Sequence, residues 1–454
     1  MSGPTPARRA AFETLRRVFE EDAWADRALR TAAERLGLEG RERAQAQALA
    51  YGAVQRRGTT DHFIAALTGR RVEKIDLPLL AALRLGLFEL LFATGTADHA
   101  AVDQAVALAK GRGGHRHGAG LVNAVLRRAA RERDELLAGL GDADPEAAAV
   151  AHSVPLWLVE LWWRELGPES ARSMLAAINE PPELALRANR LRGDRNAALA
   201  ALAEAGVEAV AADSADSTDA ARPPAPADSI VVTGGERGRV EGLIADGLVV
   251  PQSRASALVA EILAPVPGER VLDLCAGPGI KSGQIAAALG AEGAGLVAVE
   301  RDPGRAAELR EMLDRIGAGA AVVQPGDATG PPPAGPFDAV LVDPPCSGLG
   351  TLASRPDARW RRRPGDIETM AATAARILER AIEAAGPGGR VVYSTCTNSR
   401  RENEEVAGAT SARLRSLGEE PALEPLAAPS DPRFLQTRND RDRTDGFFVA
   451  ALEP

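Results

Sequence analysis

Five short apolar runs constrain the fold of the second half of this chain more than any other feature. They occupy residues 271–274, 295–300, 321–324, 339–343 and 390–393, and stretches of helical composition separate several of them. Strands that alternate with helices build a parallel sheet with helices on its faces. The pattern therefore predicts an α/β fold over residues 248–454. Because ligands of such sheets bind beyond the carboxyl ends of the strands, we expect functional residues there.

The front of the chain has a helical pattern instead. Phe12, Leu15, Val18 and Phe19 follow helix-face spacing. The same spacing relates Leu79, Leu80, Leu83, Leu87, Leu90 and Leu91. Glycine-containing breaks occur at 37–40 and 111–118. The most apolar stretch, residues 77–92, is too short for a bilayer and contains Arg84 and Glu89. Residues 1–140 are predicted to form an all-α bundle, and no membrane segment is expected.

A mixed segment lies between these two parts. It shows helical patterns at 156–166, 171–178 and 196–205 and a strand-like run at 184–189. Residues 211–228 are rich in Ala, Asp, Ser and Pro and contain no large apolar side chain, which is typical of a mobile loop. The sequence thus predicts three domains: the bundle 1–140, a small α/β linker module 147–247, and the larger α/β domain 248–454.

Charge is distributed unevenly along the chain. The net charge is −9, yet residues 1–131 contain 21 basic and 14 acidic residues. A basic front module favours a polyanion such as RNA as partner. The alternative is that scattered arginines only solvate the helices. The chain is expected to be a monomer.

The three cysteines all lie in short motifs of small, Gly/Pro or hydroxyl residues, namely Cys275, Cys346 and Cys396. Three cysteines cannot all pair in one chain, and the sequence starts with no basic and apolar leader, so free thiols in a cytoplasmic protein are expected. Cysteine can also be simply a small buried hydrophobe. His115 and His117 have no cysteine or carboxylate nearby, and no metal site is assigned to them.

The first strand of the α/β domain leads into a loop suited to a nucleotide-like cofactor. Gly277 and Gly279 allow close approach of a ligand to a helix N-terminus. Glu300, at the end of the second strand, is placed to bind a ribose, and Asp327, after the third, an adenine amino group. These features are also compatible with NAD. Asp343-Pro-Pro-Cys346 favours methyl transfer, because a strand ending this way presents a carboxylate and prolyl backbone to a flat polar base.

A series of motifs then resembles the S-adenosyl-L-methionine-dependent RNA 5-methylcytosine methyltransferases. The motifs are Asp273-Leu-Cys-Ala-Gly-Pro-Gly-Ile-Lys-Ser282, Asp343-Pro-Pro-Cys-Ser-Gly348, Arg355-Pro-Asp-Ala-Arg-Trp360, Gly386-Pro-Gly-Gly389, Tyr393-Ser-Thr-Cys396, Glu402-Asn-Glu404 and Asp445-Gly-Phe-Phe448. The helical front resembles the NusB-like RNA-binding domain, which points to bacterial 16S rRNA enzymes of the RsmB/Sun type. The resemblance implies a Rossmann-like catalytic domain. Two positions depart from the family pattern: Ile280 stands where the family has glycine, and Thr397 where it often has serine.

The resemblance also implies roles for individual residues. Cys396 would attack C6 of cytosine, Cys346 would assist product release, Asp343 would hydrogen-bond the cytosine edge, and Lys281 would lie between cofactor and base. The cofactor would contact Cys275, Ala276, Gly277, Pro278, Gly279, Ile280, Lys281, Glu300, Asp327 and Asp343. An unstacked base requires single-stranded or opened RNA, for which Arg355, Arg359, Arg361, Arg362 and Arg363 would supply charge and Trp360 a stacking face. The alternative for this segment is an arginine-rich, solvated helix start.

Three rival functions remain at this stage. A tRNA cytosine-C5 methyltransferase shares the same chemistry, and so does a DNA cytosine methyltransferase, in which the Pro-Cys cysteine attacks. Cys396 and the basic front favour RNA over DNA. The third is a noncatalytic RNA-binding assembly or antitermination factor with a degenerate methyltransferase domain. The presence of both cysteines argues against it.

Overall fold

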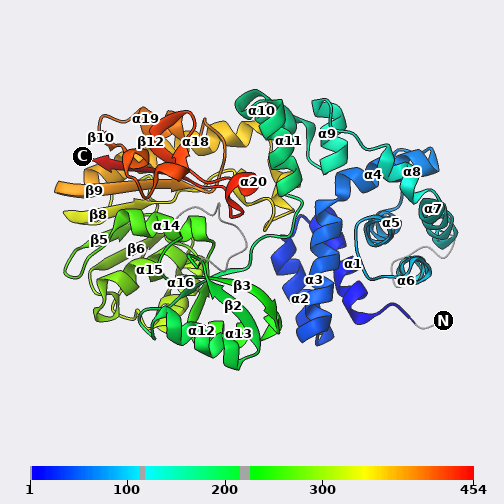
Figure 1. The fold of residues 1–454 in the computed structure, drawn as a ribbon, viewed down its shortest axis with the longest axis horizontal. Helices are drawn as coiled ribbons and strands as arrows, with labels where there is room; N and C mark the ends of the chain where they lie inside the picture. The colour runs from blue at the N-terminus through cyan, green and yellow to red at the C-terminus, as the bar shows by residue number, and fades with distance from the viewer. Residues whose placement is uncertain (1–2, 112–117, 215–224) are drawn as a thin grey trace. The chain divides into compact units, whose positions relative to one another are not determined.

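A computed structural model describes residues 3–111, 118–214 and 225–454 of the chain. It divides into two compact units (Figure 1). The first comprises residues 1–180 together with 355–361, and the second comprises 181–354 and 362–454. His115, His117 and most of the predicted loop at 211–228 lie outside the described residues.

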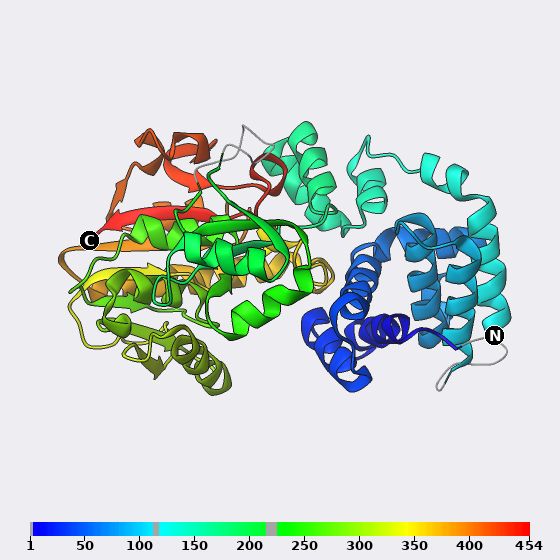
Figure 2. The same cartoon turned by 60° about the horizontal axis from the view of Figure 1, so that its bottom comes forward.

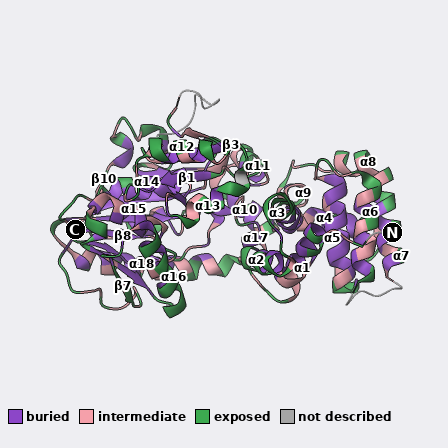
Figure 3. Cartoon of the chain, turned by 90° about the horizontal axis from the view of Figure 1, so that it is seen from below, coloured by how far each residue is buried: buried purple, intermediate pink, exposed green. Residues whose placement is uncertain are grey.

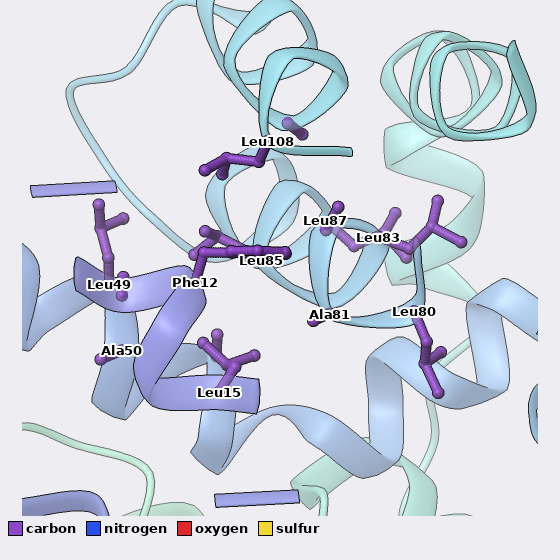
Figure 4. Close-up of a cluster of buried hydrophobic side chains, with 14 of the residues drawn as sticks. Phe12, Leu15, Leu49, Ala50, Leu80, Ala81, Leu83, Leu85, Leu87 and Leu108 are labelled. Atoms are coloured by element: carbon purple, nitrogen blue, oxygen red, sulfur yellow. The ribbon is translucent and has the colours of Figure 1, made fainter. Parts of the chain in front are cut away.

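The first unit is all-helical in its described residues, as predicted for the front of the chain. Its helices are α1 Pro6–Glu20, α2 Ala25–Leu36, α3 Gly40–Gln55, α4 Arg57–Thr68, α5 Leu77–Leu91, α6 Asp98–Lys110, α7 Ala119–Arg131, α8 Arg133–Ala138, α9 Pro145–His152, α10 Leu156–Leu166, α11 Pro168–Ala177 and α17 Ala358–Arg361. The first helix starts where Thr5 accepts a hydrogen bond from the Arg8 amide and Pro6 occupies the first turn, a common N-terminal signal. Leucines and alanines of α1, α3, α5 and α6 form the core (Figure 4).

Helix α5 is buried on nearly all sides, which explains its strongly apolar sequence. Its two charged residues are buried in ion pairs: Arg84 with Asp61 at 2.7 Å, and Glu89 with Arg8 at 2.6 Å. A buried charge requires such a partner. None of the helices in the described part of the chain combines the length and apolar character that a membrane span needs.

The units divide the chain differently from the three predicted domains. Helices α10 and α11 form where helices were predicted, but they belong to the first unit. The reason lies in α9 and the turn after it. Thr59 of α4 donates to the Val150 carbonyl at 2.5 Å, and the Gly58 amide donates to the Ser153 hydroxyl at 2.8 Å. These long-range contacts hold residues 145–180 to the bundle, and the sequence pattern does not reveal them.

The second unit begins with a small sheet. Its strands are β1 Ala185–Ala188, β2 Val207–Ala211, β3 Ser229–Gly235 and β4 Val249–Pro251, in the order β2-β3-β1-β4 and all antiparallel. Helices α12 Arg195–Glu204 and α13 Val240–Ala245 accompany it. The strand predicted at 184–189 and the helix predicted at 196–205 are both confirmed.

The large sheet of the second unit contains all five predicted strands. Its strands are β5 Val271–Asp273, β6 Leu296–Glu300, β7 Val322–Pro325, β8 Phe337–Val342, β9 Ala385–Thr395, β10 Arg413–Arg415, β11 Ala427–Ala428, β12 Asp431–Gln436 and β13 Phe448–Glu453. The path runs β11-β12-β13-β9-β8-β5-β6-β7, and β10 pairs with β13. Strands β5 to β9 pair in parallel, while β10 to β13 form an antiparallel extension (Figure 2).

Helices cover both faces of the parallel strands. They are α14 Arg254–Leu263, α15 Ile280–Leu289, α16 Pro303–Ile316, α18 Pro364–Ala384 and α19 Glu404–Gly408. A further short helix, α20 Asn439–Asp442, lies in the chain between β12 and β13. Along β8, Ala339 and Leu341 pack with α14 to α16, whereas Val340 and Val342 pack with α18. This alternation is why β5, β6 and β8 read as continuous apolar runs and why they are largely buried (Figure 3). Strand β7, at the end of the sheet, is mostly exposed. The predicted Rossmann-like α/β fold is confirmed.

Candidate active site

The two motif cysteines at 346 and 396 meet at the carboxyl ends of neighbouring strands. Strands β8 and β9 are parallel with Val342 opposite Tyr393, so the loop after β8 and the end of β9 reach the same edge of the sheet. The Sγ atoms of Cys346 and Cys396 are 3.3 Å apart. The hydrogen bond to Cys396, together with burial, raises the pKa of the Cys346 thiol. Both effects favour the protonated form of the Cys346 thiol.

A partly buried ion pair lies at the same edge. Lys281, in the first turn of α15, donates from Nζ to Asp343 Oδ2 at 2.5 Å. Burial lowers the pKa of Lys281, but Asp343 outweighs it and the net shift is upward, so the ammonium is retained. Cys396 adds to this upward shift, so a charge on its sulfur and the ammonium stabilise each other. Phe447 places its ring centroid 4.9 Å from Nζ, a contact that the sequence pattern did not predict.

Glycines shape the loop between β5 and α15. Gly279 has a φ of +104°, in the region that favours glycine, and a Cβ there would lie 2.6 Å from Leu309 Cδ1. A Cβ on Gly277 would lie 2.1 Å from Glu300 Oε2. Only a bare backbone therefore fits beside the Glu300 carboxylate. Ile280, the departure from the family pattern, is partly buried and packs against the hydrophobic cluster of α14 to α16.

Three carboxylates mark the ends of β5, β6 and the loop after β7. Asp273 is 1% exposed and accepts from Ser282 Oγ at 2.7 Å, while its Oδ1 has no hydrogen-bond partner within the described residues. Glu300 is 7% exposed and accepts from the Asp302 amide at 3.0 Å. Asp327 is exposed, and hydrogen bonds from the amide and hydroxyl of Thr329 lower its pKa. This edge is thus acidic and carries both buried and accessible acceptors.

Sequence and structure comparisons agree on the relationship of the chain to known proteins. Residues 260–453 match the model of the 16S rRNA methyltransferase RsmB/F family, residues 5–131 the NusB family, and residues 154–220 a ferredoxin-like domain of RsmF/B-like methyltransferases. A putative methyltransferase of Mycobacterium tuberculosis is 37% identical over 474 residues, covering 98% of this chain and 96% of the relative. The chain belongs to the RsmB/F methyltransferase family.

Further matches support this assignment. The ribosomal RNA small subunit methyltransferase B of Pseudomonas putida is 33% identical, covering 91% of each chain. The crystal structure of PH0851 superposes with a TM-score of 0.80 at 25% identity and covers 100% of each chain. The protein is an RNA methyltransferase of this family and uses S-adenosyl-L-methionine as methyl donor.

The methyltransferase does not present the whole arginine-rich segment to solvent. Arg359 is 0% exposed, and its guanidinium donates to the carbonyls of Ser153 and Ile178 at 3.2 Å each. Trp360 is half-buried and donates from Nε1 to the Val54 carbonyl at 2.8 Å. The expectation that Arg359 contacts phosphate is wrong for this structure, because its charge is used inside the helical unit.

The other members of that segment divide into two groups. Arg361 pairs with Asp22 at 3.1 Å, and Arg362 donates from Nε to the Ser347 carbonyl at 2.8 Å. Arg355 and Arg363 remain exposed. The Arg57 guanidinium lies over the Trp360 ring, 5.1 Å from its centroid, so one face of the predicted stacking platform already contacts a cation. Of the predicted RNA contacts, Arg355 and Arg363 keep the accessibility that such a role requires.

Asp273 gives a pH-dependent prediction for the stability of the methyltransferase. Burial raises the pKa of Asp273 from 3.8 to about 6, so folding favours its protonated form. The stabilisation is complete below pH 4 and is lost as pH rises through about 6. We expect Asp273→Asn to match the wild-type melting temperature at pH 4 and to exceed it at pH 7.5. Calorimetry measures the difference in melting temperature between variant and wild type at both pH values. An equal difference at pH 4 and pH 7.5 would contradict the raised pKa of Asp273.

Proposed function

We propose that this methyltransferase transfers the methyl group of S-adenosyl-L-methionine to C5 of a cytosine in 16S rRNA, through a covalent adduct between Cys396 and C6. The observation that carries the proposal is the pair of thiols 3.3 Å apart beside the Lys281–Asp343 ion pair. Cytosine C5 is too weak a nucleophile to accept a methyl group unaided. A thiolate that adds to C6 makes C5 electron-rich, and a second thiol can serve the separate step of release.

The residues divide the chemistry between them. The Cys396 thiolate adds to C6, and the electrons of the C5=C6 double bond become available at C5. After C5 has been methylated, a base takes the C5 proton and the C6–S bond breaks, which restores the double bond and returns Cys396 as a thiolate. Cys346 lies within hydrogen-bond distance of Cys396 and so close to the same base. In its thiolate form it can take the C5 proton and assist release. Asp343 would orient the cytosine edge, and Lys281 would hold Asp343 while stabilising charge on Cys396.

The cofactor fits the residues at the ends of β5 to β7. S-Adenosyl-L-methionine supplies an electrophilic methyl group when bound. The free Oδ1 of Asp273 can accept from its ammonium group, Glu300 from the ribose hydroxyls, and Asp327 from the adenine amino group. Residues 275–281 would contact the cofactor, and at Gly277 and Gly279, where a Cβ has no room, the contact would be made by the backbone.

Glu300→Ala tests the cofactor site. Loss of a carboxylate that accepts from ribose hydroxyls is expected to raise the dissociation constant of S-adenosyl-L-methionine about ten-fold, the size of a charge-assisted hydrogen bond. Titration calorimetry measures the constant directly. Glu311→Ala, which changes an exposed acid of α16, is the control and should leave it unaltered. Unchanged affinity in Glu300→Ala would assign that carboxylate to packing and to its bond with the Asp302 amide.

The NusB-like region is proposed to hold RNA through its exposed arginines. Arg127 and Arg131 of α7 are exposed and have no carboxylate partner within the described residues. Replacing both by glutamine should weaken rRNA binding and reduce the slope of log K against log salt by about 0.7–0.9 for each phosphate that is no longer neutralised. Filter binding over a range of salt concentrations measures the slope. Arg433→Gln, in the second unit, is the control, and equal slopes in all three proteins would contradict the proposal.

The function itself is tested with labelled S-adenosyl-L-methionine and unmodified RNA. Methyl transfer to 16S rRNA, followed by bisulfite sequencing, should show one or more cytosines that have become resistant to deamination. Transfer to tRNA alone would establish the tRNA rival. No transfer to either RNA, with cofactor binding intact, would support the noncatalytic alternative. Free thiols in all three cysteines are consistent with a reaction in the cytoplasm.

A further inference from the structure

A buried carboxylate connects the two loops that carry the thiols. Each cysteine is followed by a hydroxyl residue, Ser347 after Cys346 and Thr397 after Cys396. The Ser347 amide donates to Glu402 Oε1 at 2.7 Å, and the Ser347 hydroxyl donates to Glu402 Oε2. Thr397 Oγ1 donates to the same Oε2 at 3.3 Å. The two hydroxyl oxygens are themselves 2.7 Å apart. One carboxylate therefore joins both cysteine loops.

This network is enclosed and held from several sides. Glu402 is 1% exposed, and Ser347 and Thr397 are fully buried. The Glu402 carbonyl accepts from the Tyr393 hydroxyl at 2.6 Å, which fixes the backbone of this residue against β9. The side-chain amide nitrogen of Asn403 donates to the Thr397 carbonyl at 2.9 Å. On the other loop, Arg362 donates to the Ser347 carbonyl at 2.8 Å. Buried polar groups that are satisfied in this way rigidify the segments they connect.

We infer that Glu402 is a positioning residue that fixes the separation of Cys346 and Cys396. The loop after β8 has no regular structure between Asp343 and Gly348, so its strand does not determine where Cys346 lies. The hydrogen bonds of Glu402 reach the residue directly after each cysteine, so they control the positions of both sulfur atoms. Its importance for turnover rests on the proposed function, because two-step thiol chemistry needs both sulfurs at one base. The separation of the thiols can be tested without that function.

The test uses disulfide formation as a measure of thiol proximity. Diamide oxidises two neighbouring thiols to a disulfide and is itself reduced to the hydrazine, so both thiol protons and two electrons pass to the reagent. In the intact chain, peptide mapping by mass spectrometry follows the rate at which Cys346 and Cys396 become linked. We expect Glu402→Ala to slow this rate at least about ten-fold, since an ångström of misplacement has large effects on reactions between positioned groups.

Matched variants separate positioning from general stability. Glu402→Gln should stay close to the wild-type rate, because the amide oxygen can still accept from the Ser347 amide and its NH₂ can donate to the Ser347 hydroxyl. Thr397→Val removes one hydroxyl at nearly constant volume and should slow the reaction, whereas Thr397→Ser should not. Glu269→Ala is the control, because it breaks an ion pair with Arg390 at 2.7 Å in a different part of the same unit.

The outcomes are decisive in both directions. A rate lowered in Glu402→Ala and Thr397→Val, with Glu402→Gln, Thr397→Ser and Glu269→Ala near wild type, supports the inference. An unchanged rate in Glu402→Ala, or an equal loss in Glu269→Ala, overturns it. Should Glu402→Ala fail to fold, the two Thr397 variants decide the question alone. The disulfide assay uses neither RNA nor cofactor. A failed methyl-transfer assay would therefore contradict the proposed function and leave the positioning role of Glu402 intact.

Discussion

Cys396→Ala is expected to abolish methyl transfer and to prevent any covalent complex between protein and RNA. Without the thiolate no bond forms to C6, and C5 stays too weakly nucleophilic to be methylated. The loss should exceed about a thousand-fold, as for other reactions that depend on a covalent intermediate. Transfer of labelled methyl groups measures activity, and denaturing gel electrophoresis of the protein with RNA reveals the adduct.

Cys346→Ala should behave in the opposite way for the adduct. With attack intact and release impaired, it should accumulate a covalent complex that survives denaturation, and the double variant should form none. The control is Glu311→Ala, which changes an exposed acid of α16 and should accumulate no more adduct than the wild type. An adduct trapped by Cys396→Ala and absent in Cys346→Ala would reverse the two roles and support the assignment of the attacking thiol found in DNA methyltransferases.

Much of this site could be predicted because it lies on regular structure. The parallel strands were readable as apolar runs, and parallel strands bring their carboxyl ends to one edge. Asp343 ends one of those runs, and Cys346 and Cys396 each lie three residues beyond the end of a run. Their proximity therefore follows from topology once β8 and β9 are neighbours. Lys281 lies in the first turn of α15, the helix that follows β5. It could be expected nearby because β5 is the other neighbour of β8 in the sheet.

Other features depend on contacts between distant segments, which local patterns do not encode. The segment with Arg359 and Trp360 has the composition of a nucleic-acid contact, yet both side chains donate hydrogen bonds to carbonyls of the helical unit. The pairing of Glu402 with Ser347 and Thr397 was equally hidden. A hydroxyl after each cysteine was visible in the sequence, but only the fold shows that one acid, 55 residues after Ser347, accepts from both.

Asp343→Asn is the second variant with a large expected effect. Asparagine cannot neutralise the Lys281 ammonium, whose side chain is 11% exposed, so a buried charge loses its partner. We expect a loss of stability of about 1–3 kcal/mol, since removing one member of a partly buried pair leaves the other charge poorly solvated. We also expect methyl transfer to fall at least about a hundred-fold, because an aligned acceptor for the cytosine edge is lost from a preorganised site.

Combining the variant with Lys281→Met separates these two effects. The double variant removes both charges, so its loss of stability should be smaller than the sum of the two single losses, as for any directly coupled pair. Its methyl transfer should stay as low as that of Asp343→Asn, because neither change restores a group that orients the base. Thermal unfolding and single-turnover transfer measure the two quantities. If the double variant regained activity together with stability, Asp343 would serve only to pair with Lys281 and would have no contact with cytosine.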